Sequence, residues 1–159
     1  MCHSIKQLGI KQVLVLLCGL DQPMENILAV VYMTAGGILE RFPKLKVAFL
    51  EGNCSWLPWL LYRLDERYEL YKGIKGVINL SMKPSEYFRR QCWISVEPSE
   101  PLVQMIAECL GDNVTVISSD FPHGDHPPGG LKIFAARTDI PSKVISRTFW
   151  DNTMSLYRT

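Results

Sequence analysis

The chain has 159 residues, 47% of them hydrophobic and 21% charged, and its formal net charge is +1. This composition excludes a disordered polypeptide and predicts one compact domain, residues 1–159, with a sizeable core. The balanced charge without long basic runs argues against nucleic acid as a partner. The lack of a basic amphipathic stripe argues against a membrane surface as a partner.

Cysteine usage indicates the compartment in which the protein works. The five cysteines are odd in number and widely spaced, and no two form a Cys-x-x-Cys pair. We therefore expect buried free thiols and a reducing compartment, the cytoplasm. The cysteines are Cys2, Cys18, Cys54, Cys92 and Cys109.

The N-terminal part of the chain shows an apolar run followed by a helical pattern. Residues 13–17 are continuously apolar and fit a strand, since no small-residue cleavage site follows to mark a signal peptide. Asp21, with Pro23 soon after it, predicts a helix N-terminus. Apolar residues at helical spacing extend this helix to about Arg41, and Pro43 then ends it.

Strands and helices alternate along the rest of the chain. Each predicted strand is a short apolar run, and the longer predicted helices carry apolar residues every three or four positions. The connections are too long for hairpins, so we expect an α/β fold of parallel βα units. The predicted strands are 46–51, 92–96 and 114–119, and the predicted helices are 55–71, 83–90 and 101–110.

Each of these three strands ends in a carboxylate. Glu51, Glu97 and Asp120 follow the three apolar runs directly. Because the carboxyl ends of parallel strands meet at the same edge of a sheet, we expect the three side chains to lie close together. A single acid at a strand end is more often a helix cap, but three on one edge favour a functional site.

Five motifs in a specific order lie within about residues 24–157. One of them, Ser118-Ser-Asp-Phe-Pro-His123, contains Asp120. Together the motifs resemble the C-terminal half of the amidohydrolase-related family, the group that includes aminocarboxymuconate-semialdehyde decarboxylase and the resorcylate decarboxylases. The motifs span residues 37–59, 62–66, 83–90, 118–123 and 149–152.

The resemblance implies the C-terminal half of a (β/α)8 TIM-type barrel that acts on a small carboxylated or cyclic substrate. In such barrels a His-x-His pair, a further His and an Asp at strand ends hold a divalent metal, often zinc or manganese. Asp120 matches that Asp, so it is predicted as a metal ligand and as a catalytic residue. Glu51 stands where decarboxylase relatives often carry a proton-transferring His, and His123 continues the motif. Both are predicted to move protons.

The sequence also departs from the family pattern. Its histidines are His3, His123 and His126, so no His-x-His pair exists and three of the implied metal ligands are missing. A whole barrel takes roughly 250 residues, which predicts a truncated form here. Residues 1–22 resemble the family least and are expected to be a divergent N-terminal segment.

Two interpretations stay open. In the first, the protein is a metal-dependent hydrolase or decarboxylase that takes its missing ligands from elsewhere. In the second, it is a non-catalytic half-barrel without a metal cofactor. The second interpretation predicts a homo-oligomer, because a half-barrel has open sheet edges and an apolar inner face that self-association would bury.

Overall fold

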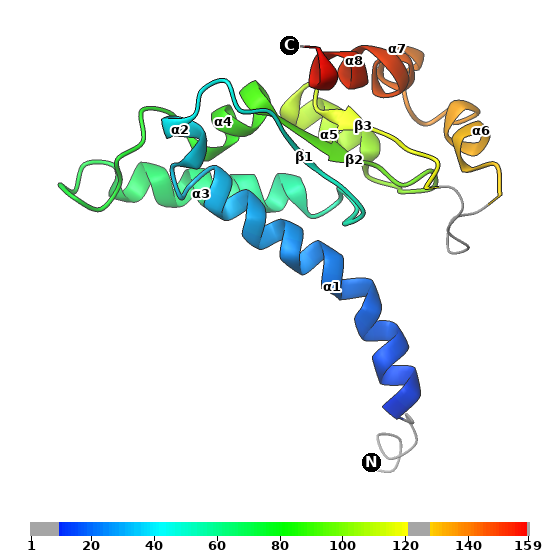
Figure 1. The fold of residues 1–159 in the computed structure, drawn as a ribbon, viewed down its shortest axis with the longest axis horizontal. Coiled ribbons are helices and arrows are strands. Elements are labelled where there is room, and N and C mark those ends of the chain that lie inside the picture. The colour runs from blue at the N-terminus through cyan, green and yellow to red at the C-terminus, as the bar shows by residue number, and fades with distance from the viewer. Residues whose placement is uncertain (1–9, 121–127, 159) are drawn as a thin grey trace.

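Three short parallel strands form the sheet in the computed structural model, which describes residues 10–120 and 128–158 (Figure 1). In sheet order the strands are β1 (Val47–Phe49), β2 (Cys92–Ser95) and β3 (Thr115–Val116). Both strand pairs are parallel, with Ala48 opposite Trp93. The three strands predicted after residue 45 and their parallel arrangement are thereby confirmed.

Helices connect the strands and follow the last one. The long helix predicted after the first strand and the helices predicted before and after the second are confirmed. The helical segments after β3 were not predicted from the sequence. The helical elements are α1 (Ile10–Met33), α2 (Ile38–Arg41), α3 (Leu57–Tyr71), α4 (Pro84–Gln91), α5 (Val103–Leu110), α6 (Gly130–Ala135), α7 (Ser142–Ser146), the π-helical turn η2 (Arg147–Asp151) and α8 (Asn152–Tyr157).

Helix α1 contradicts two predictions for the N-terminal part. Residues 13–17 are not a strand and no helix begins at Asp21, because α1 runs through both places. An apolar run with no strand beside it satisfies its backbone groups within a helix, and Pro23 removes only one of the helical hydrogen bonds. Figure 1 shows α1 leading away from the rest of the molecule. Neither α1 nor a shorter helix in the described part of the chain combines the length and hydropathy that a bilayer crossing needs.

A turn at residues 34–37 divides the segment that was predicted as one helix. Gly37 has φ 79°, in the left-handed region that glycine adopts without a steric penalty. A Cβ on Gly36 would lie 2.4 Å from the carbonyl oxygen of Tyr32. The two adjacent glycines, rather than Pro43, therefore end α1.

Apolar side chains between the sheet and helices α3, α4 and α5 form the core. Phe49 of β1 stacks on Phe88 of α4, with ring centroids 5.8 Å apart. Burial of a side chain of this size contributes roughly 1.5–3 kcal/mol to stability. The fully buried apolar residues include Leu39, Leu57, Tyr87, Phe88, Ile94, Val103, Ile106, Val114 and Phe134.

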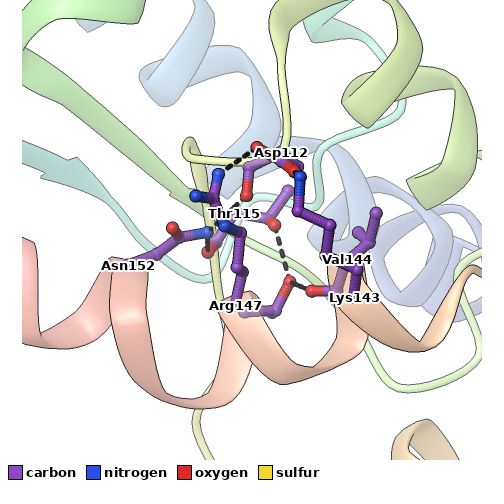
Figure 2. A network of polar contacts seen from close by, with 7 residues as sticks. Asp112, Thr115, Lys143, Val144, Arg147 and Asn152 are labelled. Atoms are coloured by element: carbon purple, nitrogen blue, oxygen red, sulfur yellow. Dashed lines mark hydrogen bonds and ion pairs between the residues drawn. The ribbon is translucent and has the colours of Figure 1, made fainter.

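Polar contacts fix the C-terminal helices against β3 (Figure 2). The hydroxyl oxygens of Thr115 and Thr148 lie 2.7 Å apart, and both residues are buried. Thr148 Oγ1 also donates to the carbonyl oxygen of Val144 at 2.8 Å. Asn152 Nδ2 donates to the carbonyl oxygen of Thr115 at 2.8 Å. A strand of only two residues thus gains its support from side chains of η2 and α8.

An ion-pair cluster lies beside these contacts (Figure 2). The Asp112 carboxylate pairs with Lys143 at 2.8 Å and with Arg147. The hydrogen bond from Lys143 and the nearby charge of Arg147 lower the pKa of Asp112, although partial burial opposes them. The ionised form of Asp112 therefore stabilises the folded state.

Lys46, directly before β1, contacts the end of the chain. Its Nζ donates to the carbonyl oxygen of Ser155 at 2.7 Å and to that of Arg158. These residues are 109 and 112 positions apart in sequence. The contact joins the amino end of the sheet to α8.

Two of the cysteines agree with the expectation of buried thiols. Cys54 and Cys92 are buried free thiols, whereas Cys109 is a free thiol at the surface. Burial raises the pKa of Cys92 to about 12, and burial beside Glu100 raises the pKa of Cys54 above its ordinary range. Both buried thiols therefore stay protonated near neutral pH.

Candidate active site at the carboxyl edge of the sheet

Three carboxylates from neighbouring strand ends surround one small cavity. Glu51 follows β1, Glu97 follows β2 and Asp120 follows β3, so parallel strands bring the acids to one edge as expected. The cavity volume is about 40 Å³, which is room for a few water molecules at most. It is lined by Leu50, Glu51, Ser95, Val96, Glu97, Ser118 and Asp120.

Contacts from β2 and α1 hold the Glu51 segment. The Glu51 amide donates to Ser95 Oγ on β2 at 3.0 Å, and Glu51 Oε2 accepts from Gln22 Nε2 at 3.3 Å. One turn further along α1, Asn26 Nδ2 donates to the carbonyl oxygen of Leu50 at 2.8 Å. Helix α1 therefore contacts the predicted catalytic segment directly, through two amide side chains.

Backbone strain gathers at this edge of the sheet. The non-glycine residues with positive φ in the described ranges are Glu51 (61°), Asn53 (55°) and Asp120 (48°). A left-handed conformation is unfavourable for a residue with a Cβ, least so for Asn and Asp, and it persists where the surroundings fix it. Such strain is common at functional sites. Glu51 and Asp120 are predicted catalytic residues. The remaining predicted catalytic residue, His123, lies outside the described residues, as does His126.

Glu100, which the sequence did not single out, ties the segments after β1 and β2 together. It is only 6% exposed. Its Oε1 accepts hydrogen bonds from the Cys54 amide at 2.8 Å, the Ser55 amide at 2.7 Å and the Ser55 hydroxyl at 2.5 Å. Its Oε2 accepts from the Glu97 amide at 3.3 Å. In the sequence, Glu100 precedes Pro101 and is typical of an ordinary acid at a helix start.

Arg137 supports the backbone of the same segment. Its Nη1 donates to the carbonyl oxygen of Glu100 at 2.6 Å and to that of Pro98 at 3.4 Å. Asp139 holds the guanidinium, with its Oδ1 3.0 Å from Arg137 Nε. The segment after α6 is thereby attached to the segment after β2.

The tryptophans near this edge have different surroundings. Trp56 is half-buried against the core and donates through Nε1 to the carbonyl oxygen of Gly52 at 2.6 Å, whereas Trp59 is 61% exposed. Neither lines the cavity. Trp93 is buried on β2, two residues before Ser95 and on the same face, and its indole N–H has no hydrogen-bond partner within the described residues.

A parallel α/β arrangement with its acids at the strand carboxyl ends is typical of (β/α)8-barrel enzymes. Among curated proteins, the chain is similar to 2-amino-3-carboxymuconate-6-semialdehyde decarboxylase of Dictyostelium discoideum. The two are 29% identical over 111 residues, which is 69% of this chain and 30% of that protein. No family model matches the chain.

Solved structures of decarboxylases share the fold. One is 5-carboxyvanillate decarboxylase from Sphingomonas paucimobilis, with a TM-score of 0.66 and 28% identity over 82% of this chain and 38% of that one. Another is dihydroxybenzoic acid decarboxylase from Polaromonas sp. JS666, with a TM-score of 0.63 and 19% identity over 84% of this chain and 40% of that one. The resemblance to amidohydrolase-related decarboxylases, and to part of their TIM-type barrel, is confirmed. The chain spans 30 to 40% of the length of these three relatives.

The Polaromonas structure contains bound manganese. Within residues 10–120 and 128–158, no group of three or more His, Cys, Asp or Glu side chains is placed to hold a metal ion. Asp120, Glu51 and Glu97 share a cavity but do not form such a group. The described residues by themselves therefore do not fit a zinc or manganese centre.

Proposed function

We propose that this edge of the sheet is the acid-bearing part of a decarboxylase site for small carboxylated, cyclic substrates. The observation that carries the proposal is the convergence of Glu51, Glu97 and Asp120 on one cavity. The similarity to 2-amino-3-carboxymuconate-6-semialdehyde decarboxylase supports the class of reaction. Hydrolysis, which the family resemblance also allows, is the less favoured reaction because these relatives are decarboxylases.

Glu51 is the proposed proton donor. In decarboxylation the bond between a substrate carbon and its carboxylate breaks, CO2 leaves, and the electron pair stays on that carbon until a proton replaces the CO2. Glu51 lies with Glu97 and Asp120 at the carboxyl edge of the sheet, where such a carbon would be bound, and its backbone amide donates to the Ser95 hydroxyl. His123 is a second proposed proton carrier. General acid catalysis of this kind contributes typically 100- to 10,000-fold in rate.

Asp120 is proposed as one ligand of a divalent metal, zinc or manganese. Support comes from its position at the end of β3 and from the manganese bound by a relative. Because the described residues supply no set of three ligands, further ligands would have to come from residues outside the described ranges or from another molecule.

The test measures CO2 release from 5-carboxyvanillate and from 2-amino-3-carboxymuconate-6-semialdehyde, with and without Mn²⁺. We expect Glu51→Gln and Asp120→Asn each to lower turnover by about 100-fold or more. Asp151→Asn removes an exposed acid of η2 and serves as the matched control, with turnover unchanged.

Two outcomes separate the parts of the proposal. If the unmodified chain releases no CO2 from either substrate at saturating Mn²⁺, the decarboxylase proposal is wrong. Metal content measured on the same samples tests Asp120 separately. Stoichiometric manganese that is lost in Asp120→Asn supports the ligand role, and manganese retained by that variant contradicts it.

A second candidate function is self-association of a non-catalytic half-barrel, and the exposed side of α1 favours it. Five large apolar side chains follow one another there at spacings of three or four residues, so they lie along one side of the helix. Each is between 46% and 66% exposed. Contiguous exposed apolar surface of this kind typically marks an interaction site. The five, called here the α1 stripe, are Leu17, Leu20, Met24, Leu28 and Tyr32.

Two further expectations stay predictions. We propose that residues 1–159 form one domain and that residues 1–22 are a divergent segment, whose boundary falls within α1. The cytoplasmic location is proposed from the widely spaced free cysteines alone.

A further inference from the structure

We infer that Glu100 is a positioning residue, whose buried carboxylate sets where Glu51 and Glu97 stand at the cavity. The inference rests on the proposed function of the carboxyl edge. Glu100 does not line the cavity, and it acts through the two backbone segments that carry the acids.

The two oxygens of the Glu100 carboxylate serve different segments. Oε1 accepts three hydrogen bonds from Cys54 and Ser55, at 2.5 to 2.8 Å, and Oε2 accepts one from the Glu97 amide. The sequence separations of 46 and 45 residues make the first set a tertiary link rather than a helix cap. One side chain therefore links the segment after β1 to the segment after β2.

The segment after β1 is fixed at both ends. At its start, the Glu51 amide donates to Ser95 Oγ, and at its end Glu100 holds Cys54 and Ser55. Between these anchors the backbone adopts positive φ at Glu51 and again at Asn53. Strained conformations persist where the surrounding structure over-determines them, so we expect loss of the Glu100 contacts to weaken the hold on Glu51 in its left-handed conformation.

Only a glutamate satisfies all of these donors. A buried carboxylate is stabilised by four hydrogen bonds, and charge-assisted bonds are about twice as strong as neutral ones. A glutamine would turn its amide N–H groups toward the amide of Glu97 or toward those of Cys54 and Ser55. An aspartate keeps the charge but is shorter by one methylene. The two substitutions therefore separate the charge of Glu100 from its reach.

The experiment compares Glu100→Gln and Glu100→Asp with Thr148→Val, which removes a buried hydroxyl from the contacts between η2 and β3. We expect amide hydrogen exchange at Cys54, Ser55 and Glu97 to become about tenfold faster or more in both Glu100 variants, because hydrogen bonds to a charged acceptor are lost. In Thr148→Val, these amides should change no more than the rest of the chain. The carboxyl carbon-13 resonance of Glu51 should move in both Glu100 variants.

The result that would overturn the inference is unchanged exchange at these amides, or a Glu51 resonance that moves in Glu100→Gln but not in Glu100→Asp. The second pattern would mean that Glu100 acts by charge and not by position. Amide hydrogen exchange and the Glu51 carbon-13 resonance can both be measured on an inactive protein. An inactive wild-type chain would therefore count against the proposed decarboxylase function alone. If the chain is active, both Glu100 variants should lower kcat at least tenfold while Thr148→Val does not.

Discussion

Gly52 lies where α1 approaches the segment that carries Glu51, and there is no space for a side chain at this residue. A Cβ on Gly52 would stand 2.1 Å from Asn26 Nδ2, the atom that donates to the carbonyl oxygen of Leu50. The backbone of Gly52 has no positive φ, so close approach rather than conformation requires glycine. The close packing of α1 on the carboxyl edge thus requires a glycine at position 52.

At this residue we expect Gly52→Ala to lower the free energy of unfolding by about 1 kcal/mol, since Asn26 must rotate away and lose its hydrogen bond. In an Asn26→Ala background the same substitution should have a smaller effect, because the amide group is gone and only the Cβ of residue 26, 3.2 Å from the new methyl group, stays close. Urea unfolding of the four proteins in this double-mutant cycle gives the coupling. Gly73→Ala is the matched control, because nothing lies within 4 Å of its Cβ. Equal effects of Gly52→Ala in both backgrounds would contradict the explanation.

Residue by residue, the sequence located part of the candidate site. Glu51, Glu97 and Asp120 could be predicted because each lies shortly after an apolar strand, and parallel strands end at one edge. Glu100 could not, because its role arises from Cys54 and Ser55, which only the folded chain brings near it. The sequence likewise could not predict that the indole N–H of Trp93 is buried without a hydrogen-bond partner in the described residues.

At the scale of elements, the sequence predicted a helix correctly where the segment was long and its apolar residues were periodic. Helix α3 has 15 residues and one apolar face, so its pattern was readable. Helices α6 to α8 have five or six residues each and are held partly by polar contacts such as those of Thr148 and Asn152. Segments so short carry too few periodic positions to be predicted. The run at residues 13–17 was assigned wrongly because a short apolar run fits strand and helix equally well.

The C-terminal elements should lose part of their support at low pH. The pKa of Asp112 is lowered from 3.8 in the folded state, chiefly by Lys143, so its contribution is complete above that value and is lost as the pH falls through the lowered one. At neutral pH we expect Asp112→Asn to lower the free energy of unfolding by about 0.2–1 kcal/mol, the range for partly exposed pairs. The difference from wild type should shrink toward zero in acid denaturation series below pH 3.8. A difference that is constant with pH would exclude the ion pairs as its cause.

For the molecule as a whole, the sheet has two outer strands, of which η2 and α8 contact β3, and the α1 stripe exposes apolar side chains. The sheet has three strands, so β1 and β3 each have one side without a neighbouring strand in the described part of the chain. The α1 stripe exposes apolar side chains along a helix that leads away from the core (Figure 1). Open edges and apolar faces are the features through which protein chains associate.

If a second copy covers the α1 stripe, charged residues there should produce a monomer. We expect the wild-type chain to sediment as a dimer or larger species in the micromolar range, and a Leu20→Lys, Leu28→Lys double variant to sediment as a monomer. Leu70→Lys places the same charge on another exposed leucine, on α3, and should leave the association unchanged. A wild-type chain that is monomeric throughout this range would rule out the self-association proposal.

The contact of Lys46 with Ser155 and Arg158 brings the entry of β1 and the exit of α8 to the same place. The backbone from residue 46 to residue 158 therefore follows a nearly closed circuit, and α1 lies outside it. A circularly permuted gene could join these two points with a short linker and open the chain at an exposed turn such as 73–76. Such a permutant would keep the strand order and the Glu100 contacts in a new chain order, but it would lack residues 1–45 and with them the contacts of Gln22 and Asn26 to the Glu51 segment.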